Sequence, residues 1–468
     1  MSNPSDHDAT PIASVDQMAA HLAAGCKPRE DWRIGTEHEK FGFVRPEAAR
    51  SRGLAPYAAP PFGPDGIESL LAGLAGNGQG WEPIRDEGQL IGLKGSGRWK
   101  GASVSLEPAG QFELSGAPLR SLHDTRTELD AHLAELRTLA EPLGIGFAPL
   151  GFQPLHGRDA MPVMPKSRYA IMRRYMPRVG SMGLDMMLRT CTVQVNLDYG
   201  SEADMARKLR VSLALQPVAT ALFASSPFRD GRPSGFLSTR AHVWTDTDNQ
   251  RSGMPPFFFE EGFGFGRYVE WVLDVPMYFV SRDDRLVDAA GLSFRRWMAG
   301  EEPALARWRP TLGDFDDHLT TAFTDVRVKR FLEMRGADAG TPQMMVAQSA
   351  FWVGLLYDEA ALLAAERLVR ELPWDAYPAL RAAVPTQGLR AAAGSRTARD
   401  LARDALAIAS DGLRARALRD GEGADERRFL APLEAIVAGA PNQAEHWLAR
   451  FDGPWNRDVR PIFDEAAV

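Results

Sequence analysis

Carboxylates at alternating positions recur in short segments of this 468-residue chain. Glu37 and Glu39 are two residues apart, and Gln111 and Glu113 repeat that spacing shortly after Glu107. Residues two apart in a strand point to the same face of a sheet. Carboxylates that converge on one face repel one another unless cations lie between them, and their hard oxygen atoms suit Mg²⁺. The pattern therefore predicts acidic ligands for a divalent cation.

A second kind of pair joins a carboxylate to a cation. Glu333 and Arg335 share one face of the segment 329–335. A metal-binding carboxylate beside an arginine is the equipment for phosphoryl transfer from ATP, because metal and arginine both neutralise charge on the phosphates. An ion pair within a strand explains the same two residues equally well, so both interpretations stay open at this point.

A solvated strand face is the usual alternative for alternating acids. Ile34 and Phe41 flank the first pair of acids, so their strand is at least half buried. Burying a charge without a partner is costly, which favours a binding role for those acids. His38 points to the opposite face and is expected in the core. Its segment begins like the zinc motif His-Glu-x-x-His, but position 42 is glycine, which excludes that motif.

Amides and arginines supply further candidates. Gln194 and Asn196 lie on one face of a strand predicted over 191–199, where they could orient a substrate or a metal-bound water. Taken alone, ordinary solvent exposure is the better interpretation of that pair. Arg168 and Arg240 lie in or near segments rich in Pro, Gly and Ser, and arginine can clamp a carboxylate through two parallel hydrogen bonds. Most arginines, however, simply lie at the protein surface, where water solvates them.

The glycine-rich segment 92–97 has the spacing of a phosphate-binding loop. It continues with Arg98 and Trp99 where such a loop needs Lys and then Ser or Thr. We therefore reject a Walker motif and predict a flexible flap.

Composition excludes several classes of protein. The net charge of -7 and the isoelectric point near 5.8 argue against a nucleic-acid-binding protein. No apolar run approaches the length of a membrane span. Cys26 and Cys191 cannot build a disulfide framework, which fits a reducing compartment. Because the N-terminus lacks a signal-peptide core, we predict a cytoplasmic protein. We also predict that it is a monomer or a homodimer.

The order of predicted elements indicates an α+β protein with an antiparallel sheet. We predict a disordered lead over 1–13 and a single catalytic domain over 14–468, of which 345–468 forms a mainly helical layer. The apolar spacing of 15–24, 123–143 and 202–224 is typical of helices. The segments 45–64 and 154–178 are predicted to be loops.

Four of these segments together carry a resemblance. They are 32–43 (Trp-Arg-Ile-Gly-Thr-Glu-His-Glu-Lys-Phe-Gly-Phe), 105–118, 183–198 and 331–338. The chain resembles the plant and proteobacterial type of glutamate–cysteine ligase from about residue 15 to its end. The resemblance implies a glutamine-synthetase-like fold, in which an antiparallel sheet forms an open funnel with helices packed behind it. It also implies that ATP, L-glutamate and L-cysteine give γ-glutamylcysteine through γ-glutamyl phosphate, the first step of glutathione synthesis.

The resemblance also implies roles for the candidates. Mg²⁺ would be bound by five glutamates: Glu37, Glu39, Glu107, Glu113 and Glu333. Arg335 would be the catalytic arginine at the phosphates of ATP, with Gln111 as a further ATP contact. The remaining candidates would bind substrate, the arginines at the carboxylate of glutamate: Arg168, Arg240, Gln194, Asn196 and Trp244. We expect Trp244, Trp271 or Tyr278 to line a small pocket for the cysteine side chain.

The chain departs from plant members in one respect. Those enzymes are redox-regulated through additional cysteines, and Arg126 stands where plant sequences tend to carry one. The plant disulfide switch is therefore not expected here. Two other functions remain open from the sequence: a related carboxylate–amine ligase with a different acceptor, and a non-catalytic sensor of glutamate or nucleotide.

Overall fold

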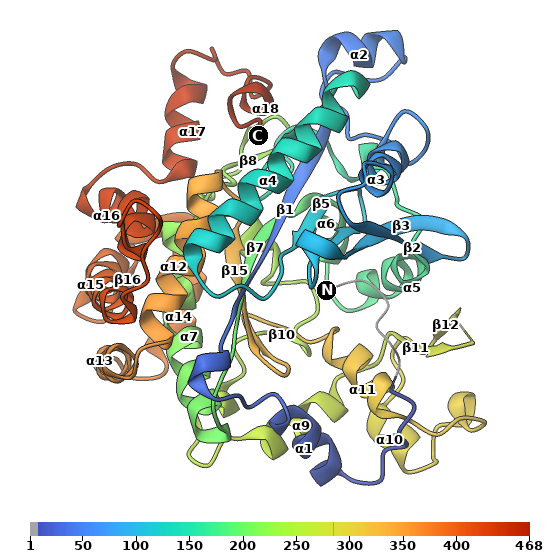
Figure 1. The fold of residues 1–468 in the computed structure, drawn as a ribbon, viewed down its shortest axis with the longest axis vertical. Helices are drawn as coiled ribbons and strands as arrows, with labels where there is room; N and C mark the ends of the chain where they lie inside the picture. The colour runs from blue at the N-terminus through green and yellow to red at the C-terminus, as the bar shows by residue number, and fades with distance from the viewer. Residues whose placement is uncertain (1–7, 284) are drawn as a thin grey trace.

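An antiparallel sheet organises the chain (Figure 1). The computed structural model describes residues 8–283 and 285–468. Within them the main sheet has nine strands, in the order β14-β15-β7-β1-β5-β4-β3-β2, with β6 paired to the far end of β1. The strands are β1 (Ile34–Val44), β2 (Trp81–Asp86), β3 (Gln89–Gly95), β4 (Ser103–Leu106), β5 (Phe112–Ser115), β6 (Ile145–Ala148), β7 (Thr192–Leu197), β14 (Val326–Val328) and β15 (Leu332–Asp338).

The register of the central strands brings the predicted polar residues onto neighbouring strands. In the pairing of β1 with β5, Glu39 lies opposite Glu113. In the pairing of β1 with β7, Glu37 lies opposite Gln194. Directly paired residues point to the same face, so segments far apart in sequence meet on one side of the sheet.

Helices cover the sheet and form a layer beside it. In chain order they are α1 (Val15–Ala23), α2 (Pro46–Ser51), α3 (Ile67–Gly76), α4 (Leu122–Ala140), α5 (Ser167–Tyr175), α6 (Gly183–Arg189), α7 (Glu202–Leu222), α8 (Thr239–Val243), α9 (Phe265–Asp274), α10 (Phe294–Met298), α11 (Leu312–Leu319), α12 (Pro342–Leu356), α13 (Glu359–Arg370), α14 (Ala376–Gln387), α15 (Ala398–Arg416), α16 (Ala431–Ala438), α17 (Gln443–Asp452) and α18 (Ile462–Glu465). None of the helices in the described part of the chain is long and apolar enough to cross a bilayer.

Helices α4 and α12 pack against the face of β1 opposite Glu37 and Glu39. The hydroxyl oxygens of Thr36 and Ser349, the latter on α12, are 2.7 Å apart. The buried ring of His38 lies 5.7 Å from that of His132 on α4. The predicted core position of His38 is therefore confirmed. With these helices behind the sheet, the other face is left for polar groups.

Local sequence signals explain the helices that were predicted. Ser14 accepts a hydrogen bond from the backbone N–H of Gln17 and caps α1. Ser121 and Asp124 form a reciprocal capping box at the start of α4. The helical layer predicted over 345–468 is present as α12 to α18, shown in orange and red in Figure 1.

The structure corrects several predicted loops. Helix α2 lies inside 45–64 and α5 lies inside 154–178. The glycine-rich segment 92–97 is not a flap, because residues up to Gly95 are paired within β3. Residues 1–7 of the predicted disordered lead fall outside the described residues. Beyond them, the N–H of Ile12 donates to the carbonyl of Pro310, 3.0 Å away, so this part of the lead is held against the domain.

The contact between α12 and α15 depends on two glycines. A Cβ at Gly412 would overlap the carbonyl oxygen of Gly354 on the facing helix. We predict that Gly412→Ala lowers the free energy of unfolding by about 1–3 kcal/mol or more, because backbone cannot move aside as a side chain can. Urea denaturation followed by circular dichroism measures the change.

Gly266→Ala in α9 is the matched control. A Cβ there meets no atom within 4 Å, so the added helix propensity should raise stability by up to ~1 kcal/mol. Equal stability of the two variants would contradict close packing at Gly412.

Candidate active site

An open pocket lies on the polar face of the sheet. It brings together most residues that the sequence singled out. Those on its wall are Glu37, Glu39, Glu107, Gln111, Glu113, Arg168, Gln194, Arg240, Trp244 and Arg335. Asn196 and Glu333 do not line it. The pocket is therefore acidic along β1 and β5 and basic along β15 and α8.

The carboxylates of the acidic wall lie close to one another, with neutral donors and cations around them. Asn196 donates its amide to Glu37, with a nitrogen–oxygen distance of 2.8 Å, and the backbone N–H of Thr192 donates to Glu39 at 2.8 Å. Burial raises the pKa of the Glu39 carboxyl well above its usual range, and repulsion from Glu107 and Glu113 adds to the rise. Burial and Glu107 likewise raise the pKa of Glu113. Arg240 offsets part of this rise for Glu39, and Lys166 does so for Glu113.

Glu107 reaches this wall from a turn rather than from a strand. Gly110, with φ of 83°, lets the chain reverse between β4 and β5. Gln111 holds the turn: its amide oxygen accepts from the N–H of Ala109 at 2.8 Å, and its amide nitrogen donates to two backbone carbonyls near α6 at 3.1 Å each. Because this amide is occupied by backbone groups, the structure assigns Gln111 to holding the wall and does not favour ATP contact.

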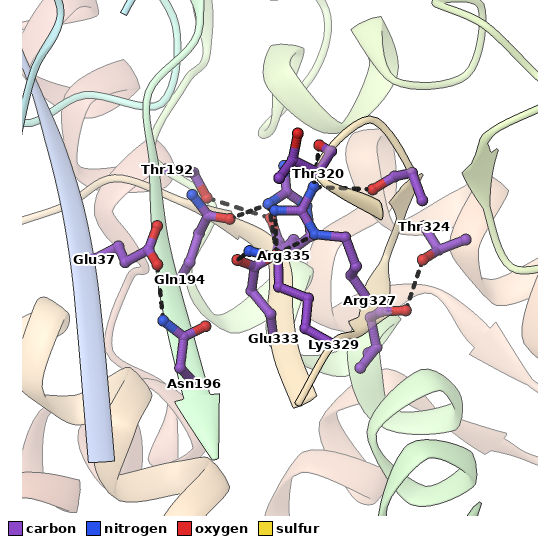
Figure 2. A network of polar contacts seen from close by, with 12 residues as sticks. Glu37, Thr192, Gln194, Asn196, Thr320, Thr324, Arg327, Lys329, Glu333 and Arg335 are labelled. Carbon is purple, nitrogen blue, oxygen red and sulfur yellow. Dashed lines mark hydrogen bonds and ion pairs between the residues drawn. The ribbon is translucent and has the colours of Figure 1, made fainter. Parts of the chain in front are cut away.

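Glu333 does not join the acidic wall (Figure 2). It is fully buried and accepts from three cations: Arg327 at 2.6 Å, Lys329 at 3.0 Å and Arg335 at 2.8 Å. Although burial opposes its ionisation, these cations hold the pKa of the carboxyl well below its usual range. Glu333 therefore lies apart from the four carboxylates that line the pocket, because three cations already balance its charge, and the metal role of these glutamates stays a prediction.

This buried carboxylate holds two arginines of the basic wall in place. Arg335 is fixed between Glu333 and the amide oxygen of Gln194, to which it donates (Figure 2). Arg327 also lines the pocket, and its guanidinium further donates to the carbonyl of Ala322 at 3.1 Å. Sequence patterns missed Arg327 because its partner is on the next strand, and the pairing of β14 with β15 cannot be read from either segment alone.

Arg240 and Trp244 enter the pocket from α8 and its C-terminal end. Arg240 is 3% exposed and donates to the backbone carbonyl of Arg335 at 2.9 Å. The ring of Trp244 meets that of Phe323 edge-on, with centroids 5.6 Å apart. Both residues therefore line one pocket, while their substrate roles stay predictions.

Arg168 lines the pocket from the first turn of α5. Its guanidinium carbon lies 5.2 Å from the centre of the Phe279 ring. The cap of this helix comes from Asp86 on β2, which accepts from the N–H of Ser167 at 2.8 Å and from its hydroxyl at 2.9 Å. That cap is 81 residues away in sequence, which is why 154–178 gave no helix signal.

Lys166 and Tyr169 are pocket-side residues that sequence reasoning did not find. Lys166 is buried and donates to the carbonyl of Leu106 at 3.1 Å; burial lowers its pKa to about 8, although Glu107 opposes this change. Tyr169 donates to the same carbonyl at 2.5 Å. Neither has a spacing that distinguishes it from an ordinary helix start.

Two aromatic residues expected in the cysteine pocket lie elsewhere. Trp271 packs among core aromatics, with its ring 5.6 Å from that of Phe257. Tyr278 is 1% exposed, and the guanidinium of Arg251 lies over its ring. Both side chains pack in or against the core, where other residues cover their apolar surface, so neither lines the pocket.

The donor chemistry of the acidic wall suits a hard divalent cation. In the part of the chain that the structure describes, no three His, Cys, Asp or Glu side chains are arranged to hold an ion by themselves. Mg²⁺ is ordinarily held by one or two carboxylates together with waters and substrate phosphates. The four pocket carboxylates fit that mode better than a closed metal cage.

Comparisons with known proteins show the family of the chain. The glutamate–cysteine ligase family 2 (GCS2) matches residues 33–465. The chain belongs to this family. Glutamate–cysteine ligase B, chloroplastic, of Oryza sativa subsp. japonica is 49% identical over 455 residues, which cover 97% of this chain and 87% of the relative. The chloroplastic glutamate–cysteine ligase of Arabidopsis thaliana is 48% identical over 461 residues, covering 98% of this chain and 83% of the relative.

A solved structure supports the fold. Glutamate–cysteine ligase of Francisella tularensis, in complex with AMP, matches with a TM-score of 0.52 and 12% identity, over 93% of this chain and 89% of that chain. At this identity the likeness concerns the fold alone. The predicted α+β, glutamine-synthetase-like fold with its antiparallel sheet and helical C-terminal region is confirmed.

The predicted cytoplasmic location is wrong by the same comparison. The relatives from Oryza sativa, Brassica juncea and Arabidopsis thaliana are all named as chloroplastic proteins. The prediction rested on the lack of a targeting signal, and a missing address carries no information about the compartment.

Neutralising Glu333 tests the network in Figure 2. We predict that Glu333→Gln lowers the free energy of unfolding by about 3–5 kcal/mol, because three cations then lack their buried counter-charge. Chemical denaturation measures this loss. Glu270→Gln is the matched control: Glu270 pairs with Arg295 at the surface, where the two side chains are 44% and 42% exposed, so the cost should stay below about 1 kcal/mol. Equal costs would contradict the network.

Proposed function

We propose that this protein is an ATP-dependent glutamate–cysteine ligase. It joins the γ-carboxylate of L-glutamate to the amine of L-cysteine and gives γ-glutamylcysteine, ADP and phosphate, the first step of glutathione synthesis. The observation that carries the proposal is a pocket whose acidic wall faces four arginines, in a chain nearly half identical to named glutamate–cysteine ligases over almost its full length.

The basic wall acts on the phosphates. Arg335, held by Glu333 and Gln194, would donate to oxygens of the γ-phosphoryl group as it passes to the γ-carboxylate of glutamate. A fixed guanidinium stabilises charge that develops during transfer without having to reorganise. The pocket position of Arg327 lets it add to this field.

The second pair of arginines acts on the amino acid. Arg168 and Arg240 would hold a carboxylate of glutamate and turn its γ-carboxylate toward the nucleotide. The cysteine amine then attacks the acyl phosphate, forms the amide bond, releases phosphate and loses a proton. Holding the reactants together supplies most of the rate, and no protein nucleophile is needed. Trp244 gives this part of the pocket an apolar side.

The acidic wall would hold Mg²⁺. The residues proposed are Glu37, Glu39, Glu107 and Glu113. Bound Mg²⁺ supplies neutralisation of charge on the triphosphate and a fixed orientation for it. The four carboxylates would keep the positive charge of Mg²⁺ opposite Arg335 and away from solvent.

Release of ADP is the decisive assay. Purified protein is given Mg²⁺, ATP and L-glutamate, with L-cysteine, with L-2-aminobutyrate as a thiol-free acceptor, or with no acceptor. We expect strong stimulation by cysteine and γ-glutamylcysteine by mass spectrometry. The control is Arg335→Ala, which should lose roughly 10²–10³ in rate and so excludes a contaminating ATPase.

Other outcomes of this assay separate the alternatives. Turnover only with other amines would retain the chemistry but assign a different acceptor. ATP binding without turnover in any mixture would overturn the ligase in favour of a sensor.

Removing one carboxylate tests the acidic wall. Glu113→Gln should raise the Mg²⁺ concentration for half-maximal rate by roughly 10–100-fold, because a charged oxygen ligand, or its close neighbour, is lost. Titration of activity with MgCl₂ at saturating ATP measures this. Glu47→Gln, on the exposed side of α2, is the control and should leave the requirement unchanged. An unchanged requirement in Glu113→Gln would remove it from the metal site.

A further inference from the structure

Asp338 is a buried carboxylate beside the pocket to which the proposed reaction gives no role. It lies on β15 and is 2% exposed. Its oxygens accept from the N–H of Ser225 at 2.9 Å, the hydroxyl of Ser226 at 2.6 Å and the hydroxyl of Ser238 at 2.8 Å. These donors are all neutral. Burial raises the pKa of the Asp338 carboxyl, and the charge of Arg240 opposes this rise together with the three hydrogen bonds.

These hydrogen bonds lead directly to α8. Ser238 is the N-cap of that helix, and its hydroxyl oxygen accepts from the N–H of Ala241 at 3.0 Å. The hydroxyl oxygen of Ser226 accepts from the N–H of Arg240 at 3.3 Å. One carboxylate therefore fixes both the start of α8 and the backbone of the arginine that α8 carries into the pocket.

Asp338 also supplies negative charge that balances the positive charge of Arg240, although the two side chains form no direct salt bridge. Burial lowers the pKa of the Arg240 guanidinium, and Asp338 is the largest of the charges that oppose this change, ahead of Glu39. In the described part of the chain, Nε of Arg240 is buried and has no hydrogen-bond partner. The guanidinium is thus compensated at a distance, and its N–H groups are not consumed by a salt bridge.

The fit around Asp338 is tight. A Cβ on Gly151 would overlap the carboxyl group, so the side chain rests directly on the backbone there. A longer acid cannot be accommodated, whereas asparagine has nearly the same shape. The serine hydroxyls can reorient toward an amide, so substitution by asparagine chiefly removes the charge.

We propose that Asp338 is a positioning residue for glutamate binding, acting through Arg240. Asp338 sets the start of α8 and counterbalances the Arg240 charge while leaving the guanidinium available to a substrate carboxylate. The inference rests on the proposed function, since it takes L-glutamate as the ligand of Arg240.

Asp338→Asn is the test. We expect KM for L-glutamate to rise roughly 10–100-fold, as for loss of a hydrogen-bonded charge. Both kcat and KM for ATP should stay within about threefold, because the acidic wall and Arg335 are untouched. Asp314→Asn is the matched control: Asp314 is a buried acid that caps α11 and pairs with Arg282. It should change stability without changing KM for glutamate.

A double variant separates positioning from general structure. Adding Asp338→Asn to Arg240→Ala should not raise KM for glutamate further, since the route through Arg240 is already gone. Effects that multiply would overturn the inference, as would an unchanged KM in Asp338→Asn. A parallel fall in kcat, ATP affinity and thermal stability would also overturn it, because that result describes a structural residue.

Failure of the proposed function would look different. It would be seen in the unaltered protein, as no cysteine-dependent turnover. Calorimetric titration of L-glutamate into the unaltered protein and Asp338→Asn then still tests the inference without turnover. Weaker binding in the variant supports it, and equal or undetectable binding in both overturns it.

Discussion

The alternation of β1 is the constraint on which the rest of the structure depends. Glu37 and Glu39 point to the pocket, while His38 and Lys40 point to the helices behind the sheet, so one strand buries ionisable groups on both faces. Lys40 is fully buried and donates to the ring of His38 at 2.9 Å, and burial lowers its pKa to about 7. A slip of one residue in register would exchange the two sets. The pairings with β5 and β7 must therefore be exact in register before any site exists.

The two walls of the pocket solve the problem of buried charge in opposite ways. On the basic wall, Glu333 is placed among cations, so Arg327 and Arg335 are held in fixed positions by a counter-charge inside the protein. On the acidic wall, Glu39 and Glu113 face another carboxylate instead, and repulsion adds to the cost of burial. Counter-charge inside the protein fixes the arginines of the basic wall, whereas the acidic wall places carboxylates beside one another, which is the arrangement that we propose for a bound cation.

The sequence was informative wherever one strand or helix carried its own signal. The period of two placed Glu37 with Glu39, and a local cap placed α4. It was uninformative where the deciding partner is distant. Asp86 on β2 caps α5. Arg327 on β14 donates a hydrogen bond to Glu333 on β15. The side-chain amide of Gln111 donates to backbone carbonyls near α6. Spacing shows to which face of a strand a side chain points, but it does not show which residue from another element forms a hydrogen bond with it there.

This difference also explains why family resemblance ranked the residues well and described their roles less well. The residues that it named for metal, ATP and substrate converge on the pocket except Asn196 and Glu333, which contact the pocket residues Glu37 and Arg335, whereas Trp271 and Tyr278 lie in the core. Pocket residues and supporting residues have the same polar types and the same period. They differ only in whether their hydrogen bonds end within the protein. For Gln111 all of them do, whereas the buried Nε of Arg240 has no acceptor among the described residues. This unfilled hydrogen-bonding capacity inside the pocket is why we propose Arg240, and not Gln111, as a ligand contact.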